Sequence, residues 1–211
     1  GTPLRMNFIV VLLYILLYDN VFGCDLFCNF ASNQHKMMMQ IRNAETADRN
    51  TLHCIYAYAR EQMAMNGNAN QWIAGYPSDE LIDEDITQGH SYVCLADDGH
   101  IAGVFCWWVD EEPTYTEIYD GKWLDNEPYG VIHRIASDGT VHGLMNFCLQ
   151  WCMERHPNIR IDTHKDNRIM QHLLQKSGFT YCGIIRTHNG TPRLAYQKRS
   201  TNINRKQTQH Y

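Results

Sequence analysis

Two histidines and one glutamate that lie near strand-like runs have side chains that could accept a proton. His133 lies in a strand-like run, His164 follows the next such run, and Glu127 precedes the first. An imidazole titrates near neutral pH, which suits it to general-base chemistry. Either histidine could equally be a half-buried side chain bonded to a main-chain carbonyl. The pattern therefore names candidate bases without choosing one of them.

A second chemical signal is the glycine-containing loop that follows the strand of His133. Gly139 and Gly143 frame this loop, and a helical pattern begins directly after it. The first N–H groups of a helix lack intrahelical acceptors and lie at the positive end of the helix dipole, so they can hold an anion. Taken alone, the two glycines also fit an ordinary turn and helix start.

The eight cysteines do not have the spacing of a metal site. Cys148 and Cys152 are one helical turn apart, whereas zinc sites typically combine two tighter pairs. Six of the eight lie in apolar or aromatic runs, which is typical of buried reduced thiols. We therefore expect no metal.

Length and charge favour one globular domain and disfavour several classes of protein. The chain has 211 residues, 44% of them hydrophobic, and a formal net charge of -5. Without a large basic field, a nucleic-acid partner is not expected. No G-x-G-x-x-G follows a strand and no G-x-x-x-x-G-K occurs, so nicotinamide-dinucleotide and P-loop folds are disfavoured as well.

Residues 1–38 differ in pattern from the rest of the chain. An apolar run from Phe8 to Tyr18 has the size of a signal-peptide core but about half the length that spans a bilayer. The first residue is not Met, and three methionines at 37–39 precede the first strand, which favours an over-extended start. A genuine signal or anchor, or a docked helix, is the alternative. We expect a cytoplasmic domain over 39–199 without membrane contact, and a disordered polar tail over 200–211.

Hydrophobic periodicity predicts a mixed α/β chain. Strands are expected at 40–44, 90–96, 101–109, 130–137, 159–163, 179–185 and 194–197, and helices at 46–65, 78–88, 141–155 and 167–177. Asp98-Gly99 predicts a hairpin between the second and third strands. The strand–helix–strand–helix–strand order from Ile132 to Ile185 implies two parallel units.

This order resembles the GNAT family of acetyltransferases, including bacterial members. The segments that carry the resemblance are Ile132–Gly139, the helix start at Gly143, the helix opened by Asn167, and Lys176-Ser177-Gly178-Phe179. It covers residues 39–199. It implies the GNAT fold, a mostly antiparallel mixed sheet with a central splayed parallel pair and flanking helices.

The resemblance also implies acetyl-CoA as co-substrate. In the family, a strand binds the pantetheine arm through its main chain, and the next helix start holds the pyrophosphate. Thr140 and Met145 depart from the family signature of this loop, whereas Gly143 matches it. The positions implied here as cofactor-binding are Ile135, Ala136, Ser137, Val141, His142, Gly143, Leu144, Met145 and Asn167. Asn167 also fits a simple helix N-cap.

The activity implied is direct transfer of an acetyl group from acetyl-CoA to an amine. His164 is favoured over His133 as the base, because ligands meet α/β sheets at the ends of parallel strands. The family's usual tyrosine acid falls at Leu174, so Tyr181 is the nearest candidate proton donor.

The acceptor, a small molecule or peptide amine, is expected between two polar and aromatic loops, 66–77 and 110–128. Its expected contacts are Trp72, Tyr76, Glu127 and Tyr129. A solvated acidic loop is the alternative interpretation of the second segment. A non-catalytic GNAT-fold binding or interaction module remains the alternative function, and a homodimer is possible.

Overall fold

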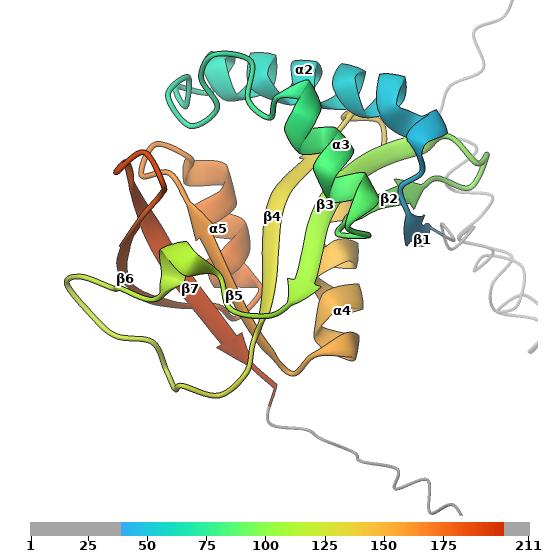
Figure 1. The fold of residues 1–211 in the computed structure, drawn as a ribbon. Helices are drawn as coiled ribbons and strands as arrows, with labels where there is room; N and C mark the ends of the chain where they lie inside the picture. The colour runs from blue at the N-terminus through green and yellow to red at the C-terminus, as the bar shows by residue number, and fades with distance from the viewer. Residues whose placement is uncertain (1–38, 201–211) are drawn as a thin grey trace, which may run out of the picture. The chain divides into compact units, whose positions relative to one another are not determined.

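The computed structural model describes residues 39–200, which form a seven-stranded mixed sheet with helices on both faces (Figure 1). The strands are β1 (Gln40–Asn43), β2 (Ser91–Leu95), β3 (Ile101–Val109), β4 (Gly130–Ser137), β5 (Asn158–Thr163), β6 (Thr180–Arg186) and β7 (Pro192–Arg199). The helices are α2 (Arg49–Met65), α3 (Asp79–Thr87), α4 (Leu144–Arg155) and α5 (Arg168–Lys176), with short 3-10 turns at Thr46–Asp48 and Pro113–Tyr115. Every expected strand and helix is present, with ends shifted by a few residues. The apolar run at 8–18 and the tail from 201 lie outside the described residues.

Alternation along the strands divides the core between the two faces of the sheet. Val93 and Val104 pack with α2 and α3 on one face, whereas their neighbours Cys94 and Phe105 pack with α4 and α5 on the other. This follows from the period of two in a strand, which sends successive side chains to opposite faces. The result is a layer of helices on each side of the sheet (Figure 1).

Five of the six expected cysteines in the described range are buried, and Cys54 is the exception. Cys94, Cys106, Cys148 and Cys152 lie in or beside the core, whereas Cys54 is exposed on α2. A helix that covers a sheet has a solvent face, and Cys54 lies on it.

Within residues 39–200, no group of three or more His, Cys, Asp or Glu side chains could hold a metal ion. No helix in that range is long and apolar enough to cross a membrane.

The strand order, β1-β2-β3-β4-β5-β7-β6, contains a single parallel pair of neighbours, β4 and β5. The second parallel unit expected from the chain order does not form a neighbouring pair, because β7 enters between β5 and β6 and pairs antiparallel with both. The β4–β5 ladder joins only 130–132 to 159–161. From His133 onward, the edge of β4 that faces β5 therefore has no strand partner, and the two strands splay apart.

A β-bulge in β4 changes which side chains share a face. Arg134 has φ of +52°, and the register between β3 and β4 shifts by one residue there. The extra residue interrupts the alternation. Ile132 and Ile135, three residues apart, consequently pack into the same core cluster. The consecutive His133 and Arg134 share the other face: Arg134 donates to Asp85 of α3, and Cys106, the ladder partner of His133, donates to the same carboxylate.

Candidate active site

A cavity of about 640 Å³ lies beside the open part of β4 and the start of α4. All nine residues expected to bind the cofactor line it, from Ile135 on β4 through the loop to Met145, together with Asn167. Gly143 is the N-cap of α4 with φ of +79°, and no atom lies within 4 Å of the place its Cβ would occupy. The main chain here is therefore open to a ligand, and the first N–H groups of α4 are available to an anion.

A second cavity, of about 810 Å³, adjoins the first along β4. Ile135 and Asn167 line both cavities, so the two meet where β4 and β5 separate. Trp72 and Tyr76, expected at the acceptor site, line this larger cavity. The arrangement has room for two ligands that approach one another at the splay.

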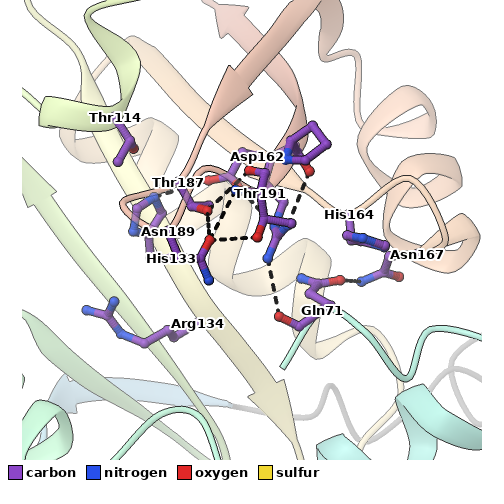
Figure 2. Close-up of polar contacts among 12 residues, drawn as sticks. Gln71, Thr114, His133, Arg134, Asp162, His164, Asn167, Thr187, Asn189 and Thr191 are labelled. Carbon is purple, nitrogen blue, oxygen red and sulfur yellow. Dashed lines mark hydrogen bonds and ion pairs between the residues drawn. The ribbon is translucent and has the colours of Figure 1, made fainter. Parts of the chain in front are cut away.

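The junction of the two cavities is held together by Gln71, from the loop between α2 and α3. Its side-chain oxygen accepts hydrogen bonds from Asn68 (2.8 Å) and Asn167 (2.9 Å). Its main-chain carbonyl accepts one from Arg193 of β7 (3.2 Å). Figure 2 shows this bridge between Gln71 and Asn167. Asn167 also accepts the N–H of Met170, so its expected role as the N-cap of α5 is confirmed.

His133 belongs to a polar cluster at the wall of the larger cavity. The Tyr115 hydroxyl donates to Asp162 (2.8 Å) and lies 3.0 Å from His133 Nε2. The same nitrogen is 3.3 Å from the Asp162 carboxylate. His133 is a partly exposed member of this cluster and lines the cavity, as does Asp162.

These contacts define the tautomer of His133. Burial raises the pKa of Tyr115, and the charge of Asp162 adds to the rise. The phenol therefore stays protonated and donates a hydrogen bond to Asp162. Burial by itself acts to raise the pKa of Asp162, but hydrogen bonds from His133 and Tyr115 outweigh it and the pKa is lowered. An ionised carboxylate and an occupied hydroxyl both accept, so Nε2 carries the proton. Nδ1 then keeps a lone pair, which no hydrogen bond from residues 39–200 occupies.

His164 lies in a different setting, beyond the end of β5. It is 6% exposed and lines neither cavity. Its Nδ1 accepts the main-chain N–H of Asp166 (3.2 Å), and burial together with the charge of Arg193 lowers its pKa. This geometry favours His133, not His164, as the histidine that meets a substrate.

Three other expected site residues line neither cavity, although the Tyr129 hydroxyl accepts the main-chain N–H of Glu112, which lines the larger one. Tyr181 is an exposed residue of the edge strand β6, where its ring packs on Tyr196 at 5.7 Å. Glu127 is exposed in the loop before β4, and Tyr129 packs against Arg160, whose guanidinium lies 3.9 Å from its ring centre. Both precede the paired end of β4, whereas the cavities lie along its open end. Leu174, at the family's tyrosine position, is fully buried in the core.

A buried ion pair on the cavity wall was not expected from the sequence. Arg134 donates to Asp85 of α3 (2.6 Å) and to the Tyr76 hydroxyl (3.3 Å), and the Cys106 thiol donates to the second oxygen of Asp85 (3.3 Å). Asp162 and Tyr115 were likewise not identified as catalytic candidates. A carboxylate within the strand-like alternation of β5 was the available signal for Asp162, because an acid in a buried strand needs a partner.

Comparison with known proteins agrees with this geometry. Residues 52–179 match the model of the acetyltransferase (GNAT) family. A GNAT-family acetyltransferase structure from Streptococcus agalactiae is 38% identical, with a TM-score of 0.70 over 78% of this chain and 96% of that one. One from Listeria monocytogenes is 19% identical, with a TM-score of 0.59 over 77% and 95%, and supports the fold alone. No curated protein matches the chain.

The fold and the paired cavities are those of an acyl-CoA-dependent acyltransferase, and the chain belongs to the GNAT family of acetyltransferases. The mostly antiparallel sheet with a splayed central pair, expected from the sequence, is confirmed.

Proposed function

We propose that this protein transfers an acetyl group from acetyl-CoA to a primary amine by direct transfer. The observation that carries the proposal is the meeting of two cavities at the splay of β4 and β5. Holding both substrates at one junction converts a bimolecular reaction into an effectively unimolecular one. Acetyl-CoA occupies the cavity beside α4, the amine occupies the larger cavity, and a cytoplasmic location is part of the proposal.

The mechanism begins with His133. Its Nδ1 accepts the proton of the amine, while Asp162 stabilises the imidazolium that forms through Nε2–H. The neutral nitrogen attacks the thioester carbonyl, and main-chain N–H groups on the unpaired edge of β4 stabilise the oxyanion. When the tetrahedral intermediate collapses, the C–S bond breaks, the nitrogen gives up its second proton to water, and the CoA thiolate takes a proton from solvent. Leu174 cannot donate one, and Tyr181 is remote from both cavities.

The test is acetyl transfer itself. Full-length protein is incubated with acetyl-CoA and a panel of primary amines, and both free CoA thiol and the mass of the N-acetyl product are measured. Formation of both in equal amounts supports the proposal. Binding of acetyl-CoA without turnover of any amine would instead support a non-catalytic CoA-binding module, which the departures at Thr140, Met145 and Leu174 favour.

Cofactor binding depends on Gly143. Saturating acetyl-CoA should raise the Tm of the wild type by roughly 5 °C or more, because a ligand that binds only the native state stabilises it. In Gly143→Val the side chain enters the cavity and resists the positive φ, so most of this shift should disappear. Differential scanning fluorimetry measures both.

Gly190→Val is the matched control for that experiment. Gly190 has φ of +78° and free space around its Cβ position, like Gly143, but lies in the β6–β7 turn and does not line the cofactor cavity. It should lose stability to a similar degree and keep the full acetyl-CoA shift. Equal shifts in wild type and Gly143→Val would place the cofactor elsewhere.

A further inference from the structure

The larger cavity carries an excess of negative charge. Six carboxylates and two guanidinium groups line it. The carboxylates belong to Glu84, Asp85, Asp110, Glu111, Glu112 and Asp162. Each guanidinium already has a carboxylate: Arg134 lies 2.6 Å from Asp85, and Arg193 lies 3.9 Å from Asp162. Four carboxylates are left without a cationic partner in the described part of the chain.

Among these four carboxylates, Glu112 is the one for which the lack of a cationic partner is most costly. It is only 7% exposed, and no lysine, arginine or histidine nitrogen of residues 39–200 lies within 4.0 Å of it. Its two hydrogen bonds, from the N–H (3.1 Å) and hydroxyl (2.8 Å) of Thr114, both go to Oε1. Oε2 accepts none from the described residues. Burying a charge without a counter-ion is costly, so a cation in the cavity would relieve Glu112.

The nitrogen that reacts cannot be that cation. It must be deprotonated before it attacks the thioester, so its charge is absent in the transition state. A charge that pairs with Glu112 throughout the reaction must therefore lie on a second group of the acceptor.

Aromatic side chains of Trp72, Tyr76 and Trp108 line the same cavity and suit both the methylene chain and the cationic end of such a molecule. About 810 Å³ is within the usual range for small-molecule sites.

We propose that the acceptor is an aliphatic diamine or polyamine, whose second, charged amino group is bound by Glu112 and the neighbouring carboxylates while the first is acetylated. This inference rests on the proposed function, since it assigns a substrate class to the same site. The acceptor's positive charge also matches the remaining acids at the cavity, Glu84, Asp110 and Glu111.

The test compares three acceptors of similar length: cadaverine, n-pentylamine, and δ-aminovalerate, which carries a carboxylate in place of the second amine. We expect kcat/KM for cadaverine to exceed that for n-pentylamine by about 10- to 100-fold, the range of one charge-assisted hydrogen bond. The acid should be the poorest of the three. In Glu112→Gln the ratio of cadaverine to n-pentylamine should fall to about threefold or less. Glu61→Gln removes an exposed carboxylate of α2 that lines neither cavity, so the ratio should remain at its wild-type value.

Equal kcat/KM values for the diamine and the monoamine would overturn the inference and leave the proposed transferase activity intact. An unchanged ratio in Glu112→Gln would overturn the assignment to Glu112. If no amine is acetylated, calorimetric titration of the CoA-bound protein decides: tighter binding of cadaverine than of n-pentylamine upholds the diamine site while the transfer function fails. If cadaverine and n-pentylamine bind equally, or if neither binds detectably, the proposed diamine site is wrong as well.

Discussion

Replacing His133 with glutamine is expected to lower kcat/KM by about 100-fold or more, because general-base catalysis by a positioned side chain typically contributes that much. Glutamine keeps a polar group near Tyr115 and Asp162 but cannot accept a proton at neutral pH. The wild-type rate should rise with pH, because a larger fraction of the amine is then neutral. In His133→Gln the rate should stay far below that of the wild type at every pH, because glutamine cannot take the proton in its place. Release of CoA thiol as a function of pH measures both effects.

Two substitutions serve as controls for that prediction. His164→Gln alters a buried histidine that lines neither cavity, and it should keep the shape of the wild-type pH profile. Tyr181→Phe should cost less than about tenfold, which is about 1.4 kcal/mol in the barrier. Should His133→Gln keep the wild-type profile while His164→Gln loses it, the base is His164, as the sequence favoured. A hundredfold loss in Tyr181→Phe would assign the acid to that tyrosine.

Replacing Arg134 with methionine is expected to lower the free energy of unfolding by about 3 to 5 kcal/mol, the usual cost of removing one partner of a buried ion pair. Asp85 is 5% exposed and would lose both its counter-ion and its shortest hydrogen bond. Burial disfavours the charged guanidinium, but Cys106, Tyr76 and Asp85 outweigh that effect and raise the pKa of Arg134. Arg134 therefore stays charged near neutral pH. Urea unfolding followed by tryptophan fluorescence measures the loss.

The double variant Arg134→Met/Asp85→Leu shows how much of the stability lost in Arg134→Met is due to the unpaired charge of Asp85 and how much to the lost packing of Arg134. With both charges removed, no uncompensated carboxylate remains, and the variant should recover most of the stability lost in Arg134→Met. A double variant as unstable as the single one would show that the packing of Arg134, and not its charge, stabilises this wall. A loss below about 1 kcal/mol in Arg134→Met would mean that solvent reaches Asp85 and screens it.

The cofactor half of the site was predictable from the sequence because it depends on local signals. A strand, a loop with Gly139 and Gly143, and the start of α4 are consecutive in the chain. Periodicity and glycine positions report such a segment directly, and the resemblance assigned its role. The nine residues so named line one cavity. In the proposed binding mode main-chain groups hold the cofactor, so it does not depend on the side chains of Thr140 and Met145.

The acceptor half depended on contacts between distant segments. Tyr115 meets Asp162 across 47 positions and Arg134 meets Asp85 across 49, so no local pattern could pair them. The assignment of Glu127 and Tyr129 to this site came from their nearness to β4 in sequence, but they precede its paired end and the cavities lie along its open end. Sequence distance does not show which end of a strand is splayed.

The sequence alone therefore determined the order of the elements, the mixed α/β class and the loop proposed to bind the cofactor, because periodicity, turn residues and glycines act within a few positions. Only the tertiary structure decided which of the two histidines lines a cavity. Strict alternation along β4 would place His133 and Arg134 on opposite faces, and the bulge at Arg134 puts both on the face that α3 covers. At that bulge the register between β3 and β4 shifts by one residue. The register of a strand pair is set by the packing of the whole sheet rather than by any short stretch of chain.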